Sequence, residues 1–77
     1  MYEELDTIVL AKDMKKYHLK RGDIGAVVHV YKDKRAIEAE FLTAEGKTVA
    51  VLTLKNDDVR PVRKDEIMHV REFASFV

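Results

Sequence analysis

Three histidines and several carboxylates are the residues best suited to catalysis or metal binding, and their spacing does not favour either function. His18, His29 and His69 lie too far apart for a helical His-x-x-x-His zinc motif. His29 could approach Glu38 or Glu40 if a hairpin aligned them, but a histidine hydrogen-bonded across a sheet is the commoner arrangement. We therefore expect no catalytic residue, no metal site and no cofactor.

Other catalytic patterns are also missing from the sequence. Ser75 is the single serine, there is no cysteine, and the isolated glycines match no phosphate-binding loop. A core built from 77 residues supplies roughly 3–5 kcal/mol of net stability, so a deep active site would remove contacts that the fold needs. These features predict a protein that binds at its surface and is not an enzyme.

The segment 12–21 has a local excess of positive charge. It contains five basic residues and one acid, although the formal net charge of the whole chain is zero. Its basic residues could contact phosphates while Tyr17 stacks on a base. The candidate residues are Lys15, Lys16, Tyr17, Lys20 and Arg21. A neutral chain is unusual for a dedicated nucleic-acid binder, so a solvated loop is the simpler explanation.

Tyrosines offer a further binding chemistry, the aromatic groove that recognises proline-rich peptides. The chain has no tryptophan, and Tyr17 and Tyr31 are the two candidates for such a groove. We include Tyr31 among the binding candidates, but two tyrosines make a poor aromatic lining.

The C-terminal tail, residues 65–77, is rich in apolar and aromatic side chains. Ile67, Met68, Val70, Phe73 and Phe76 need a surface to cover, and a small core cannot bury them all. Apolar anchors flanked by charges are typical of compact protein interfaces. Met68, Phe73 and Phe76 are therefore candidate contacts to a protein partner, which could be a second copy of the chain.

Five short segments carry the apolar and β-branched pattern of strands. Residues 36–42 alternate most clearly, with Ile37, Ala39 and Phe41 on one face and glutamates on the other. The expected strands cover residues 5–11, 24–31, 36–42, 48–54 and 59–62. A helical turn is expected near residues 13–17, and a tight turn or a single 3-10 turn at 55–58. This pattern predicts an all-β fold, a small antiparallel barrel.

Two glycines have specific structural meaning. Gly22 suits the third position of a type II turn, so the tripeptide Arg21-Gly22-Asp23 is interpreted as a turn and not as an integrin motif. Gly25, near the start of an apolar strand, indicates a bulge or a close backbone approach.

The tail fits two patterns. Ile67, Val70, Ala74 and Val77 form a helical stripe with Asp65 as N-cap. Met68, Val70, Ala74 and Phe76 fit one face of a strand. We favour the helix, and both alternatives remain open.

The whole chain, residues 1–77, is expected to be a single domain with a barrel core at about 5–64 and the tail at 65–77. No apolar run is long enough to span a membrane, and the acidic beginning Met1-Tyr2-Glu3-Glu4 does not resemble a signal peptide. Together with the lack of cysteine, this favours a cytoplasmic location.

The order of the expected elements resembles an SH3-like five-stranded barrel with a short extra helix or strand at its C-terminus. Two segments, residues 56–62 and 19–28, carry this resemblance. Residues 56–62, Asn-Asp-Asp-Val-Arg-Pro-Val, look like the junction of the 3-10 turn and last strand, and residues 19–28 resemble the barrel start of KOW domains.

Across nearly the whole chain, the sequence is similar to a family of small bacterial and archaeal proteins described as a domain of unknown function, number 4926. The resemblance is carried by the segments 5–7, 19–25, 28–31, 59–62 and 69–72. The family pattern implies glycine in the hairpin turn where this chain has Lys34. It implies no activity and no catalytic residue. We expect an adaptor, regulatory or antitoxin-like module that contacts proteins, with binding to RNA or DNA through residues 12–21 as the alternative.

Overall fold

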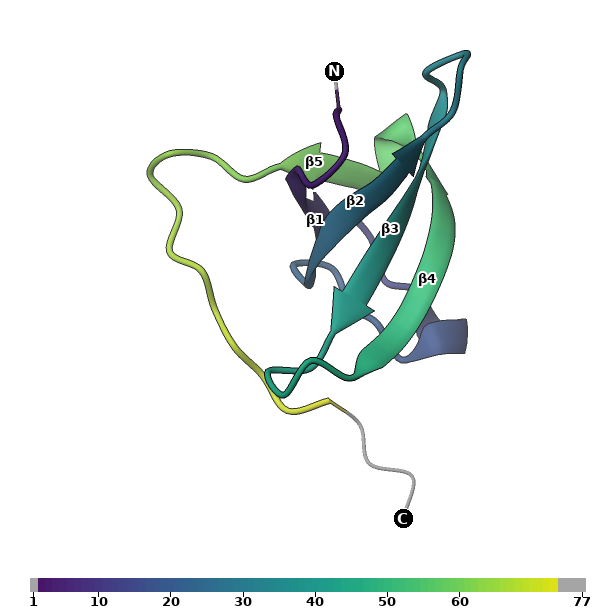
Figure 1. Ribbon diagram of the computed structural model, residues 1–77. Helices are drawn as coiled ribbons and strands as arrows, with labels where there is room; N and C mark the ends of the chain where they lie inside the picture. Colours follow the sequence, from purple (N-terminus) through teal and green to yellow (C-terminus); the bar gives the residue numbers. More distant parts are fainter. Residues whose placement is uncertain (1, 74–77) are drawn as a thin grey trace.

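The computed structural model describes residues 2–73 and contains one five-stranded antiparallel sheet (Figure 1). The strands are β1 (Thr7–Leu10), β2 (Ile24–Val30), β3 (Ala36–Leu42), β4 (Thr48–Lys55) and β5 (Val59–Pro61). Two 3-10 turns, η1 (Lys15–Tyr17) and η2 (Asn56–Asp58), lie between β1 and β2 and between β4 and β5. The predicted all-β class, the five strands and both helical turns are confirmed.

The strands lie side by side in the order β4-β3-β2-β1-β5. This order and the 3-10 turn before the last strand agree with the SH3-like arrangement expected from the sequence. The sheet is bent, but within residues 2–73 no ladder joins β4 to β5, so it does not close as a barrel. The edge strands are therefore β4 and β5.

The core lies on the inner face of the bent sheet. Ile37, Ala39 and Phe41 of β3 point inward as predicted, and each is at most 2% exposed. The other members of this buried cluster are Ile8, Leu10, Leu19, Val27, Leu52, Leu54 and Val59. Burying each large aliphatic or aromatic side chain contributes about 1.5–3 kcal/mol, so this cluster is the main stabilising feature of the sheet.

Gly25 lies where β2 passes very close to β3. A Cβ atom at this position would lie 2.7 Å from Cε2 of Phe41 and 3.0 Å from the carbonyl oxygen of Glu40. The predicted close approach is confirmed. The bulge lies further along β2, between Val27 and His29, and it leaves both Val28 and His29 on the exposed side.

Two turns show how the local sequence fixes the connections. The amide of Asp23 donates a hydrogen bond to the carbonyl of Lys20 at 2.9 Å, and Gly22 has φ of +95°, as the predicted type II turn requires. In the turn between β2 and β3, Lys34 has φ of +59°, a conformation that favours glycine. The glycine that the family resemblance led us to expect here would adopt this φ without strain.

The tail differs from both predictions made for it. Residues 62–73 form neither a helix nor a strand, and residues 74–77, including Phe76, lie outside the described part of the chain. The Glu66 carboxylate accepts hydrogen bonds from Arg60 and from the backbone of Arg63, which closes a single turn in place of a helix. The tail leaves β5, arches away from the sheet and returns beside the turn between β3 and β4 (Figure 1).

Candidate functional site

An arginine of β5 anchors the first end of the arch. Arg60 donates two hydrogen bonds to the Glu66 carboxylate, with Nη1–Oε1 and Nη2–Oε2 distances of 2.8 and 2.7 Å. The Arg63 amide donates to the same Oε1 at 2.7 Å. The hydrogen bonds from Arg60 and then from Arg63 lower the pKa of Glu66 to about 2, so this carboxylate stays ionised at neutral pH.

A second arginine anchors the other end. Nε and Nη2 of Arg71 donate to Oδ1 and Oδ2 of Asp23 at 2.7 and 2.5 Å, and Nη2 also donates to the His18 carbonyl at 3.1 Å. The Lys20 amide donates to Asp23 as well, at 2.8 Å. The Asp23 carboxylate therefore accepts hydrogen bonds both from its own turn and from the tail. In the tripeptide Arg21-Gly22-Asp23, this carboxylate is already paired with Arg71.

The pKa of Asp23 is lower than that of an ordinary aspartate. Burial is the largest single influence and raises this pKa, but the hydrogen bonds from Arg71 and the Lys20 backbone together outweigh it. The pairing with Asp23 also raises the pKa of Arg71. Both partners thus stay charged over the physiological pH range.

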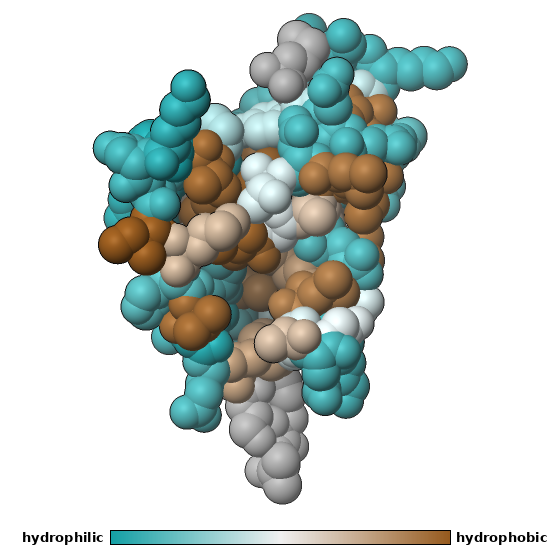
Figure 2. Space-filling model, turned by 60° about the vertical axis from the view of Figure 1, so that its left-hand side comes forward, coloured by the Kyte–Doolittle hydropathy of each residue, from teal (hydrophilic) through white to brown (hydrophobic). Residues whose placement is uncertain are grey.

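Between these two anchors lies an exposed apolar segment, residues 67–70, which we call the strap. Ile67, Met68 and Val70 are 90%, 60% and 89% exposed. Three large apolar side chains within four residues form an unusual concentration at the surface of a small domain. In Figure 2, which brings this side of the molecule forward, hydrophobic side chains stand out beside a hollow. The strap includes Met68, one of the predicted contact residues.

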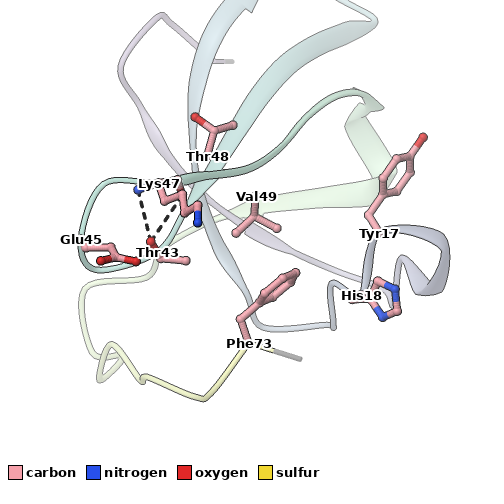
Figure 3. Close-up of a pocket in the computed structure, with 8 residues that line it drawn as sticks. All are labelled: Tyr17, His18, Thr43, Glu45, Lys47, Thr48, Val49 and Phe73. Carbon is pink, nitrogen blue, oxygen red and sulfur yellow. Dashed lines mark hydrogen bonds between the residues drawn. The ribbon is translucent and has the colours of Figure 1, made fainter. Parts of the chain in front are cut away.

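Phe73 has a different position from Met68, although both were predicted as contact residues. It is partly buried against the core, and its ring meets His18 edge-on with 6.4 Å between centroids. Phe73 also lines an open hollow of about 630 Å³, together with Tyr17, His18 and Val49 (Figure 3). Phe73 therefore packs the end of the tail against the sheet.

The predicted basic candidates lie on one loop. Lys15, Lys16 and Tyr17 form η1, and the exposed Lys20 and Arg21 belong to the turn that follows. Tyr17 is 39% exposed, and Nζ of Lys16 lies 5.7 Å from the centroid of its ring. The structure therefore brings a cation and an aromatic ring together at this surface.

Lys12, in the same basic segment, is already paired. Its Nζ lies 2.8 Å from Oδ1 of Asp58, whose carboxylate also accepts the Lys55 amide at 2.9 Å. The hydrogen bond that Lys12 donates to Asp58 raises the pKa of Lys12. Burial, the largest influence on Asp58, raises its pKa, but these hydrogen bonds lower it overall. Lys12 thus ties the loop to η2.

Tyr31 lies apart from the basic loop. Its hydroxyl donates to Oε1 of Glu38 at 2.6 Å, a bond that raises the tyrosine pKa, and its ring meets His29 at 4.8 Å between centroids. The hairpin does place His29 opposite Glu38. Because β2 ends at the opposite end of the sheet from η1 (Figure 1), Tyr31 and Tyr17 do not line a common groove.

Neither a metal-binding cluster nor a membrane-spanning helix is present in residues 2–73. Residues 2–73 contain no group of three His, Cys, Asp or Glu side chains that could hold a metal ion. No helix within these residues is long and apolar enough to cross a membrane.

The anchoring residues Arg60, Glu66 and Asp23 were not among the predicted site residues. In the sequence, each is a charged residue in a chain that is 36% charged, and nothing marks it as paired. No local pattern in the sequence links Asp23 to Arg71, because the two residues lie 48 positions apart.

Comparison with known proteins places the sheet within a family. The family model described as "Domain of unknown function (DUF4926)" matches residues 4–61, so the chain belongs to this family. The matched region includes all five strands and ends at Pro61, before the strap. No curated protein and no solved structure matched the chain.

Proposed function

We propose that this protein is a non-catalytic binding module, adaptor-like, regulatory or antitoxin-like, that contacts a protein partner through the strap. The observation that carries the proposal is the exposure of Ile67, Met68 and Val70 between two bidentate arginine–carboxylate pairs. The cysteine-free sequence supports a cytoplasmic setting for this contact.

Anchoring at both ends gives the strap a physical advantage in binding. A free tail loses conformational entropy when it docks, and each immobilised flexible side chain adds about 0.5–1.5 kcal/mol to that loss. The pairs Arg60–Glu66 and Arg71–Asp23 restrict the backbone before any partner arrives. Methionine and aliphatic side chains can then supply the apolar centre of an interface.

Substitution of the strap tests this function. We expect Ile67→Asp/Val70→Asp to abolish capture of the partner from native lysate without changing the melting temperature, because both side chains are exposed. The matched control is Leu5→Asp, since Leu5 is also apolar and 85% exposed but lies before β1. The proposal fails if the double variant captures the same proteins as the wild type and the control.

The same variants test self-association through the tail. If the partner of the strap is a second copy of the chain, sedimentation of the wild type gives a dimer and the double variant gives a monomer. If the partner is another protein, the strap substitution leaves the sedimentation coefficient unchanged and removes only the captured protein.

A second candidate function is nucleic-acid binding through the basic loop. It is favoured by Lys16 above the exposed Tyr17 ring, with Lys15, Lys20 and Arg21 nearby in the chain. Binding to single-stranded RNA or DNA is then expected to weaken steeply with salt, and again in Lys15→Ala/Lys16→Ala/Lys20→Ala. The absence of a mobility shift at low salt rules this candidate out.

A further inference from the structure

The end of the tail is held on the sheet by two side chains. Arg71 donates hydrogen bonds to both carboxylate oxygens of Asp23 and to the His18 carbonyl. Phe73 packs against the core cluster, and its ring meets the His18 ring edge-on. Asp23 and His18, which we call the docking site, lie between β1 and β2, whereas Arg71 and Phe73 follow β5. The tail and the docking site therefore complement each other in charge and in apolar surface.

The strap leads to the docking site without packing on the sheet. Among residues 2–73, no backbone–backbone hydrogen bond involves residues 67–70. An open hollow of about 440 Å³ lies between the strap and the sheet, with His69 and Val70 on one side and Leu19 and Phe41 on the other. The path that the strap takes is therefore fixed by its two ends and not by contacts along its length.

The strap is also long enough to reach a neighbouring molecule. An extended chain spans about 3.3–3.6 Å per residue, so the segment from Glu66 to Arg71 can cover roughly 17 Å. The arch that contains this segment already projects from the sheet (Figure 1). A second copy packed against the arch lies within this reach, and the Arg60–Glu66 pair need not break.

We propose that the tail is exchanged between two copies of this chain, so that Arg71 and Phe73 of each copy bind the docking site of the other. The resulting dimer is two-fold symmetric, and every contact of the docking site is kept. Exchange of an identical element is a low-cost route to a dimer, because the interface already exists within one copy. The inference rests on the proposed function, since it names a second copy of the chain as the partner of the strap.

Exchange gives the exposed strap something to pack against. In a single copy, Ile67, Met68 and Val70 remain at the surface. In the dimer the two straps cross near the two-fold axis and cover each other's apolar side chains, which removes apolar surface from water. The formal net charge of the chain is zero, so no overall repulsion opposes the approach of two copies. Burial of the strap therefore favours the exchanged dimer over a tail docked on its own copy.

A mixing experiment with two variants tests the exchange. Asp23→Arg and Arg71→Asp each place like charges in both docking sites of a dimer, so each variant alone should dimerise about a hundredfold more weakly than the wild type, or less. In an equal mixture, an exchanged heterodimer contains the native pair at one site and the reversed pair at the other. Sedimentation equilibrium of the mixture should therefore recover the wild-type dissociation constant to within about tenfold. A tail docked on its own copy gains nothing from mixing.

Two controls separate this pairing from changes in folding and in net charge. The double variant Asp23→Arg/Arg71→Asp has opposite charges at both sites and should dimerise by itself, which shows that the turn tolerates the substitutions. Arg35→Asp makes the same charge change as Arg71→Asp in the exposed turn between β2 and β3, and should leave the dimer unchanged. Circular dichroism of every variant checks that the sheet is retained.

The wild type gives a second test that needs no substitution. In an equal mixture of ¹³C-labelled and unlabelled chains, isotope-filtered NMR detects contacts between different copies only. Exchange predicts such contacts between the rings of Phe73 and His18, whose centroids lie 6.4 Å apart. Diluting the sample should weaken these contacts as the dimer dissociates.

The inference is overturned by a strictly monomeric wild type, by a mixture of the two variants that does not dimerise, or by a dimer that lacks contacts between Phe73 and His18 of different copies. If the mixture does not dimerise but Ile67→Asp/Val70→Asp still loses a captured protein, the exchange is wrong and the proposed function stands. If the mixture dimerises and the strap substitution changes neither the dimer nor the captured proteins, the exchange stands and the proposed function fails.

Discussion

The sheet and the tail of this protein are held in place by different forces. Residues 7–61 form five strands around an apolar cluster, and within the described chain that core contains no buried polar or charged residue. Residues 62–73 lack regular structure and are fixed by two arginine–carboxylate pairs and by Phe73. A small domain can thus hide its apolar residues in one region and present them in another, provided that charged contacts replace burial.

The largest expected effect comes from removing a core side chain of the sheet. Phe41 is 2% exposed, so Phe41→Ala should destabilise the protein by about 3–5 kcal/mol through lost burial and the cavity left behind. A core of this size supplies roughly 3–5 kcal/mol, so the variant should be largely unfolded at 25 °C. Urea denaturation followed by circular dichroism measures this loss.

The matched control is a phenylalanine of the tail. Phe73→Ala should leave the sheet folded, because Phe73 only covers the margin of the core. Equal loss of stability in the two variants would show that the tail is part of the core, and the contrast between the regions would be lost.

A smaller effect is expected where β2 meets β3. Gly25→Ala places a methyl group 2.7 Å from the Phe41 ring and 3.0 Å from a backbone oxygen, so the sheet must shift to accept it. Overpacking of this kind costs about 1–3 kcal/mol. The denaturation midpoint in urea measures the effect, and an unchanged midpoint would mean that the Phe41 ring moves aside freely.

Acid should affect the tail before the core. The folded pKa of Glu66, about 2, lies below its ordinary value of 4.5, so the pairing with Arg60 is fully present above pH 4.5 and is lost as the pH falls towards 2. The buried core contains no titratable residue among the described positions. Two-dimensional NMR spectra should show the amide signals of residues 67–70 moving in this window while those of β3 persist. Simultaneous loss of the signals of residues 67–70 and of β3 would show that the tail and the core do not respond to acid separately.

Much of the sheet could be predicted from the sequence, because side-chain alternation and turn residues are visible within short segments of the chain. The alternation of Ile37, Ala39 and Phe41 identified an inner face, and Gly22 identified a turn that needs positive φ. The missing closure of the barrel could not be predicted, since the same strand pattern fits an open or a closed sheet. Closure depends on whether β4 and β5 meet, and neither strand contains that information.

The tail was the hardest part to predict, because its structure depends on contacts between residues distant in the sequence. Its apolar spacing fitted a helix or a strand, but the Arg71 side chain pairs with Asp23, far away along the chain. Met68 is 60% exposed, whereas Phe73 is partly buried against the core, beside the residue that pairs with Asp23. Contact of either residue with a partner stays a prediction.

Restraint of the strap by its two anchors can be measured directly as the backbone order parameter, by ¹⁵N relaxation in the wild type and in Arg71→Ala. We expect values for residues 67–70 near the roughly 0.85 of rigid backbone in the wild type, and values below about 0.6 in the variant, while β3 stays unchanged in both. Values below about 0.6 in the wild type would rule out this restraint, because the strap would then be a free tail and not a segment held ready for a partner.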